Sequence, residues 1–267
     1  TMISNYGCML IGAPGSGKTT LSAGLSECYR QLKRDTITIN LDPANDHCEA
    51  DYDINELISV TDCMDRLGLG PNGALRYCIA TLAANPGWLL SKCKANKGKY
   101  LVLDCPGQLE LYTAESEMIK FIRAIEAAGI RLCAVHLTDS FYCADPSNFV
   151  SVVMSTLSSM VALEMPQINI LSKADLFNEA DLPYELSFYT ELPDIGRLVD
   201  VLDSDPLLAR YKALNAAIGS VIHGSGLVQF IPLDINSKSD MARLICFTDK
   251  ANGFQLIDKD IRGLVLQ

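Results

Sequence analysis

Short apolar runs alternate with helical segments along most of this chain, and that alternation constrains the fold more than any other feature. The strand-like runs lie at residues 7–11, 36–41, 100–103, 132–137, 167–171 and 227–232. Helices are expected at about 17–34, 73–93, 114–128, 146–164, 206–222 and 239–251. Strands that are separated by helices pair in parallel, so we predict an α/β fold with a mostly parallel central sheet between two helical layers.

The length of 267 residues fits one large domain that spans the whole chain, 1–267. Two segments interrupt the alternation, at about 43–72 and 173–205, and both are rich in Asp, Asn, Pro and Gly. We interpret them as insertions that carry short helices. Ligands of such sheets bind at the carboxyl ends of the strands, which is where the motifs below fall.

A complete phosphate-binding motif, Gly12-Ala-Pro-Gly15-Ser16-Gly17-Lys18-Thr19, follows the first strand and opens the first helix. Glycines let consecutive backbone N–H groups surround the phosphates, the lysine reaches the β- and γ-phosphates, and the hydroxyl after it ligates Mg²⁺. This motif in this context predicts a P-loop NTPase fold, a three-layer sandwich with helical insertions. The expected phosphate-binding residues are Gly15, Ser16, Gly17, Lys18, Thr19 and Thr20.

Two acidic positions at strand ends complete the predicted metal site. Asp104 ends the third strand-like run in Asp104-Cys-Pro-Gly-Gln108, the arrangement in which a carboxylate holds the Mg²⁺ sphere. Asp42 follows the second run and faces the same edge. We therefore predict Thr19, Asp42 and Asp104 near Mg²⁺, with the Gly107 amide at the γ-phosphate and Gln108 orienting the attacking water.

The motif Ser172-Lys173-Ala-Asp175 follows the fifth strand and predicts a guanine site. Its aspartate accepts hydrogen bonds from the N1–H and 2-amino groups of guanine, a donor pair that adenine lacks. The lysine stem packs over the base. Pro232 and Leu233, expected after the sixth strand, lie where a loop at the edge of the base is predicted.

Composition excludes several other classes of protein. The chain has 22 Lys and Arg against 32 Asp and Glu, which argues against nucleic-acid or anionic-membrane binding, because such binding needs clustered basic residues. Ten cysteines without a C-x-x-C pair predict buried thiols in an intracellular protein. The uncharged stretch 146–163 is interpreted as a core helix, so no membrane span is predicted.

Taken together and in order, the motifs resemble the GPN-loop GTPases over nearly the whole chain. The resemblance includes the P-loop, Leu41-Asp-Pro-Ala44, Gly70-Pro-Asn72, the segment from Asp104 to Thr113, and Ser172-Lys-Ala-Asp175. Stretches such as 136–146, 163–169 and 249–253 are most similar to the second eukaryotic paralogue. Two departures are Ala74 where a second glycine is common and Ser172 where the guanine motif usually begins with Asn.

The resemblance implies a dimer in which the Gly-Pro-Asn loop of one subunit reaches the phosphates of the other. Asn72 then acts in trans beside Asp42 and Gln108, with Glu110 in the same family motif. It also implies GTP and GDP as ligands, a homodimer or a heterodimer with a paralogue, and a role in the assembly and nuclear import of RNA polymerase II. The expected location is the cytoplasm, with shuttling to the nucleus.

Two other functions fit the same motifs. A P-loop phosphotransferase would pass the γ-phosphoryl group to an acceptor, although the sequence has no evident acceptor-binding lid. A binding scaffold would hold nucleotide as a structural element with little turnover, although Gln108 and Asn72 then have no evident purpose.

Overall fold

The computed structural model describes residues 5–45, 49–113, 115–176, 184–192, 196–204 and 209–254. At its centre lies a seven-stranded sheet in the order β3-β2-β4-β1-β5-β6-β7, and each neighbouring pair is parallel. This confirms the α/β class and the parallel sheet. The strands are β1 (Tyr6–Gly12), β2 (Thr36–Asn40), β3 (Tyr52–Asp53), β4 (Tyr100–Asp104), β5 (Arg131–Asp139), β6 (Gln167–Ser172) and β7 (Phe230–Leu233).

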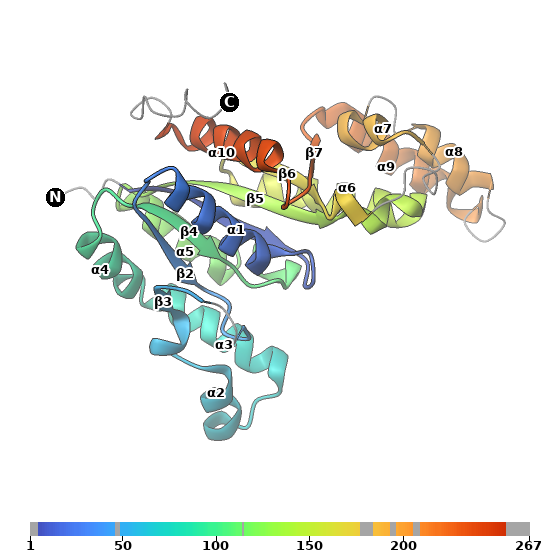
Figure 1. Cartoon of the computed structure of the whole chain (residues 1–267). Helices are drawn as coiled ribbons and strands as arrows, with labels where there is room; N and C mark the ends of the chain where they lie inside the picture. Colours follow the sequence, from blue (N-terminus) through green and yellow to red (C-terminus); the bar gives the residue numbers. More distant parts are fainter. Residues whose placement is uncertain are drawn as a thin grey trace.

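Helices cover both faces of the sheet, with α1 and α10 on one side and α3, α4 and α5 on the other (Figure 1). The two short helices α7 and α8 lie with α9 beyond β7, and α2 projects away from the sheet. The helices are α1 (Lys18–Gln31), α2 (Val60–Leu67), α3 (Pro71–Ala84), α4 (Gly87–Ala95), α5 (Glu117–Ala127), α6 (Pro146–Leu163), α7 (Leu186–Glu191), α8 (Gly196–Ser204), α9 (Lys212–Ser225) and α10 (Lys238–Asn252).

The period of two along β1 explains why the sheet needs both helical layers. Met9 and Ile11 pack into the core beneath α3, α4 and α5, whereas Cys8 and Leu10 pack into the core beneath α1 and α10. All four side chains are buried. A strand that is apolar on both faces requires cover on both sides, as is typical of parallel sheets.

The structure differs from the predicted elements in two places. The single helix expected at 73–93 is two helices, because Asn85-Pro86 interrupts it and proline disfavours helical backbone in the residue before it. The first insertion adds a seventh strand, β3, of only two residues. So short a strand shows no alternation in the sequence and forms because it pairs with β2.

Helix α6 is long and apolar enough to cross a membrane by length and composition alone. Its Phe149, Val153 and Leu157 are instead buried in a hydrophobic cluster with residues of β6, β7 and α7–α9. One face of α6 therefore packs in the core, although only 33% of the helix is buried and Val161 is exposed.

Candidate functional site

The carboxyl end of β1 runs into a tight loop that opens at the start of α1. Gly17, the residue before the helix, has a left-handed backbone with φ of 96°. Gly12 has a φ of 140°, and a Cβ added there would lie 2.2 Å from the Leu137 carbonyl oxygen. Both positions therefore need glycine. The resulting loop presents the N-terminus of a 14-residue helix, which is a favourable site for an anion.

Lys18 lies at the centre of this loop with its side chain turned back over it. Its Nζ donates to the carbonyl oxygens of Gly12 at 3.0 Å and Ala13 at 3.1 Å. Burial lowers the pKa of Lys18, and the nearby carboxylates Asp104 and Asp42 oppose that shift. The ammonium group thus donates to neutral carbonyl oxygens, which an anion such as phosphate can replace as acceptors.

A cluster of three polar side chains joins the start of α1 to the end of β4. The Thr19 hydroxyl donates to Asp104 Oδ2 at 2.7 Å. Asn45 Nδ2 donates to Thr19 Oγ1 at 2.9 Å and lies 3.4 Å from Asp104 Oδ2. The structure therefore brings together two of the three predicted metal ligands, Thr19 and Asp104.

Asp42, the third predicted ligand, lies in the loop directly after β2. Burial raises the pKa of Asp42, while its hydrogen bond from the Ala44 amide and the charge of Lys18 act in the opposite direction. The charges of Asp42 and Lys18 each affect the pKa of the other group, so this carboxylate lies close enough to the P-loop lysine to interact with it electrostatically.

The loop after β4 lies directly against the P-loop. A Cβ on Gly107 would lie 2.9 Å from Lys18 Nζ and 3.0 Å from the Pro14 nitrogen, so only glycine fits there without displacement. The Oε1 atom of Gln108 is buried and accepts no hydrogen bond within the described part of the chain. Glu110 is exposed in the short helical turn Leu109–Tyr112, away from this contact.

The predicted guanine motif is tied to the P-loop through its serine. Ser172 Oγ donates to the carbonyl oxygens of Ser16 at 2.8 Å and Thr138 at 3.1 Å. Lys173 has a left-handed backbone with φ of 60°, and its Nζ lies 2.6 Å from Asp139 Oδ2. Asp175 is exposed in the turn that follows.

The Gly-Pro-Asn segment lies at the tip of the α2–α3 hairpin, which projects from the sheet (Figure 1). Gly70 precedes α3, Pro71 occupies its first turn, and Asn72 is exposed. Within the described residues, Asn72 forms no hydrogen bond with the P-loop of its own chain. The loop is therefore presented outward.

The expected position of Pro232 and Leu233 was wrong in one respect. They are the last two residues of β7 and not the loop after it, because the pairing with β6 extends to Ser172 and Leu233. The following loop begins at Asp234. A contact of Pro232 or Leu233 with a base stays a prediction.

Sequence reasoning missed two asparagines that organise the loop after β2. Asn40 is fully buried, and its Nδ2 donates to the carbonyl oxygens of Asp42 and Asn45 and to Asp53 Oδ2. Its Oδ1 accepts the Asp42 amide. Asn45 is the residue that contacts Thr19. The only available signal was their position at either side of Asp42, at the end of a strand.

The arrangement has the parts that phosphoryl chemistry requires at one edge of the sheet. The N-terminus of α1 carries Lys18, and the Thr19 hydroxyl is hydrogen-bonded to the Asp104 carboxylate. The Asp42 carboxylate interacts electrostatically with Lys18, and the Gln108 side-chain oxygen is buried. Such sites act by positioning and by electrostatic stabilisation of charge.

Known proteins are similar to this chain over most of its length. A family model described as "Conserved hypothetical ATP binding protein" matches residues 10–254. "GPN-loop GTPase 2" of Danio rerio is 42% identical over 97% of this chain and 84% of the relative. The protein of the same name from Xenopus tropicalis is 43% identical over 93% of this chain and 83% of the relative.

A protein from Arabidopsis thaliana and a solved structure are also similar to this chain. "GPN-loop GTPase QQT1" of Arabidopsis thaliana is 41% identical over 93% of this chain and 85% of its own length. Among solved structures, a GTPase from Pyrococcus abyssi in its apo form superposes with a TM-score of 0.72 at 22% identity, covering 92% of this chain and 97% of the other. At that identity, the structural match supports the fold alone.

Proposed function

This chain belongs to the GPN-loop GTPase family, and from that premise we propose that it binds GTP at the carboxyl ends of its strands and hydrolyses it. The observation that carries the proposal is the hydrogen bond of 2.7 Å between Thr19 and Asp104, with Lys18 and Gly107 in contact beside it. These residues come from the P-loop and from the loop after β4, which are the two phosphate-facing segments of such an enzyme.

We propose that the bound nucleotide carries Mg²⁺. The residues fit that ion, since a hydroxyl and carboxylates are the hard oxygen ligands that Mg²⁺ prefers. Within the described residues, no group of three His, Cys, Asp or Glu side chains could hold a metal. That agrees with Mg²⁺, which is usually bound by one or two protein ligands together with phosphates. The ion would neutralise charge on the β- and γ-phosphates.

For hydrolysis, the chain's own residues would hold a water in line with the γ-phosphate. Asp42 and Gln108 are the candidates within one chain. Asp42 interacts electrostatically with Lys18, and Gln108 Oε1 is buried and accepts no hydrogen bond from the described residues. Lys18 and the backbone amides of the P-loop and Gly107 would stabilise the developing charge. Glu110 is proposed only as a family position, since it is exposed.

The base specificity is proposed to be guanine, although the description of the family model names ATP. Ser172 anchors the motif to the P-loop, which leaves Lys173 and the exposed Asp175 to meet the base. Binding of GDP and ADP to the purified protein distinguishes the two. We expect Asp175→Asn to weaken GDP and favour xanthosine diphosphate, because an amide reverses one donor and acceptor. Equal binding of GDP and ADP would contradict the assignment.

We further propose that two subunits form the working enzyme, as a homodimer or with a paralogue, and that Asn72 acts across the interface. Its exposed position at the tip of the projecting hairpin supports action on another chain. An amide there would help to orient water or to stabilise γ-phosphate charge in the partner's site.

Complementation between two inactive variants tests this arrangement. Asn72→Ala keeps a complete phosphate site but lacks the loop amide, and Lys18→Met keeps the loop but lacks the site. If Asn72 acts in trans, mixing the two variants restores phosphate release in mixed dimers. If mixing restores nothing while each variant is folded and dimeric, the trans mechanism is wrong.

The cellular role is proposed from family membership alone. We propose assembly and nuclear import of RNA polymerase II, in the cytoplasm with shuttling to the nucleus, through binding of polymerase subunits or assembly factors by one nucleotide state. Co-purification of polymerase subunits with the wild type but not with Lys18→Met would support it. Equal recovery with both would show that the binding is independent of nucleotide.

A further inference from the structure

One contact at the phosphate site is not explained by the proposed roles of the site residues. Asn45 directs its side-chain N–H group at the hydrogen-bonded pair Thr19 Oγ1 and Asp104 Oδ2, at 2.9 Å and 3.4 Å respectively. These are the two oxygens that the proposed function assigns to Mg²⁺. An N–H group that faces both a hydroxyl oxygen and a carboxylate oxygen supplies positive charge where a cation would otherwise supply it.

Three hydrogen bonds hold the backbone that carries this side chain. The Asn45 amide donates to the Asp42 carbonyl oxygen at 3.1 Å. Asn40 Nδ2 donates to the Asn45 carbonyl oxygen at 3.2 Å and to the Asp42 carbonyl oxygen at 3.1 Å. Because Asn40 is fully buried on β2, the loop has a rigid anchor at its base. The Asn45 amide group is therefore directed at Thr19 by the fold.

We propose that Asn45 is a positioning residue whose side-chain N–H group competes with Mg²⁺ for Thr19 Oγ1 and Asp104 Oδ2. The inference rests on the proposed function, since it requires that Thr19 and Asp104 would hold the nucleotide's Mg²⁺. Binding of the ion by these residues would require the Asn45–Thr19 hydrogen bond to break. The residue thereby sets the Mg²⁺ concentration at which the nucleotide becomes tightly held.

A role for Asn45 as a ligand of Mg²⁺ makes the opposite prediction for the affinity of the Asn45→Ala variant. If its amide turned to offer Oδ1 to the cation, removal of the side chain would weaken Mg²⁺ binding. If the N–H group competes with the cation, removal strengthens it. The loss of one competing hydrogen bond corresponds to a change of about five-fold in the dissociation constant.

The experiment measures release of fluorescently labelled GDP from the protein at buffered concentrations of free Mg²⁺, which gives the dissociation constant of Mg²⁺ without turnover. We expect Asn45→Ala to bind Mg²⁺ about five-fold more tightly than the wild type. Asn45→Asp should bind it more tightly still, because it replaces the donor with a carboxylate. Asn85→Ala serves as the control, since Asn85 is exposed at the far end of α3 and should leave the constant unchanged.

Unchanged or weaker Mg²⁺ binding by folded Asn45→Ala would overturn the inference while leaving the proposed function intact. Failure of the proposed function has a different signature, because labelled GDP would then leave the wild type at a rate independent of Mg²⁺. If Asn45→Ala does not fold, Asn45→Leu decides the question, because it is close in size to asparagine and has neither a donor nor a ligand atom; Mg²⁺ binding no tighter than that of the wild type contradicts the inference.

Discussion

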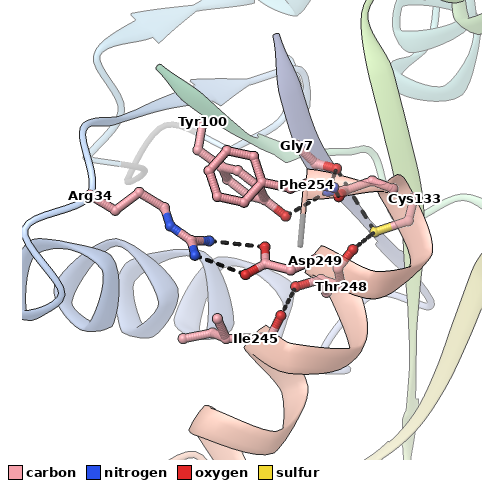
Figure 2. A network of polar contacts seen from close by, with 9 residues as sticks. Gly7, Arg34, Tyr100, Cys133, Ile245, Thr248, Asp249 and Phe254 are labelled. Atoms are coloured by element: carbon pink, nitrogen blue, oxygen red, sulfur yellow. Dashed lines mark hydrogen bonds and ion pairs between the residues drawn. The ribbon is translucent and has the colours of Figure 1, made fainter. Parts of the chain in front are cut away.

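The two ends of the central sheet carry polar clusters that are built in opposite ways. At the amino ends of the strands, Arg34 and Asp249 form a pair with two hydrogen bonds of 2.9 and 2.8 Å (Figure 2). At the carboxyl ends, Lys18 donates to the backbone carbonyl groups of Gly12 and Ala13. The buried charges at the amino ends are joined directly, whereas buried Lys18 at the carboxyl ends interacts with the charges of Asp104 and Asp42 but donates to carbonyl groups.

The cluster at the amino ends connects α10 to the sheet. Asn252 donates to the Gly7 carbonyl oxygen and to the Tyr100 hydroxyl. The Arg34 guanidinium lies 4.5 Å from the ring centre of Phe254, and both residues are drawn in Figure 2. The side chains of Arg34 and Asp249 are 7% and 0% exposed. Such a closed network stabilises one structure and leaves little for a ligand to change.

The cluster at the carboxyl ends is electrostatically unfavourable in its present state. Burial lowers the pKa of Lys18 and raises the pKa of Asp42, which means that the fold penalises the charged form of each. A polyanion with a cation can compensate both. The comparison teaches that paired buried charges in this fold mark structure, whereas separated ones mark the place where a ligand binds.

The largest effect on stability is expected at the paired end. Arg34→Ala leaves Asp249 buried without its guanidinium, and we expect it to lower the free energy of unfolding by about 3–5 kcal/mol. Urea denaturation measures this, with Arg30→Ala as the control because its pair with Glu27 is exposed. A loss below about 1 kcal/mol would mean that the buried pair does not hold α10 in place.

The next largest effect is expected on GTP binding at the carboxyl ends of the strands. Lys18→Met should weaken GTP binding about 100-fold, since it removes a charged donor to phosphate worth about 3 kcal/mol. Its stability should be equal to or higher than that of the wild type, because a buried charge is replaced by an apolar side chain of similar length. Calorimetric titration and urea denaturation report the two quantities. A marked loss of stability would break the distinction between the two ends.

A third prediction concerns pH and His136, which lies on β5 beside the P-loop strand. Burial, with a smaller contribution from the charge of Lys18, lowers the pKa of His136 to about 4. The unfolded chain binds a proton near pH 6.5 and the folded chain does not, so this residue makes stability fall as the pH drops from about 6.5 to 4. The full loss is about 3 kcal/mol.

His136→Gln should remove that part of the acid sensitivity, measured as the difference between urea denaturation at pH 7 and pH 4.5. His223→Gln is the matched control, because His223 is exposed on α9. An unchanged pH dependence in His136→Gln would show that His136 becomes protonated in the folded protein without cost.

The smallest effect is expected at the rim of the site. Lys173 and Asp139 form an ion pair of 2.6 Å with side chains 39% and 24% exposed. Lys173→Ala should therefore change the free energy of unfolding by no more than about 1 kcal/mol. The change should shrink further at high salt, because ions screen exposed pairs. A decrease in the free energy of unfolding above about 2 kcal/mol would show that this pair stabilises the fold in the way a buried ion pair does.

The amino-acid sequence predicts which residues share the carboxyl edge of the sheet, because those residues are close in sequence to strand ends. Lys18 and Thr19 follow β1, Asp42 follows β2, and Asp104 ends β4, so their common edge follows from parallel pairing. Periodicity and the glycine motif are local signals, and they were sufficient for the parallel sheet.

Contacts between distant segments could not be predicted in this way. Arg34 and Asp249 are 215 residues apart, and no local pattern indicates that they meet. The hydrogen bond of Asn45 to Thr19 depends on how the loop after β2 is anchored by the buried Asn40. The end of β7 at Leu233 likewise depends on its pairing with Ser172 of β6, and Pro232 is tolerated there because β7 is an edge strand.

The most direct test of the account combines phosphate release with light scattering over a range of protein concentrations, with GTP and Mg²⁺ in excess. We expect the rate per subunit to rise with concentration and to level off when the protein is fully dimeric, because Asn72 of one subunit completes the site of the other. A constant rate per subunit from a protein that remains monomeric would contradict the account.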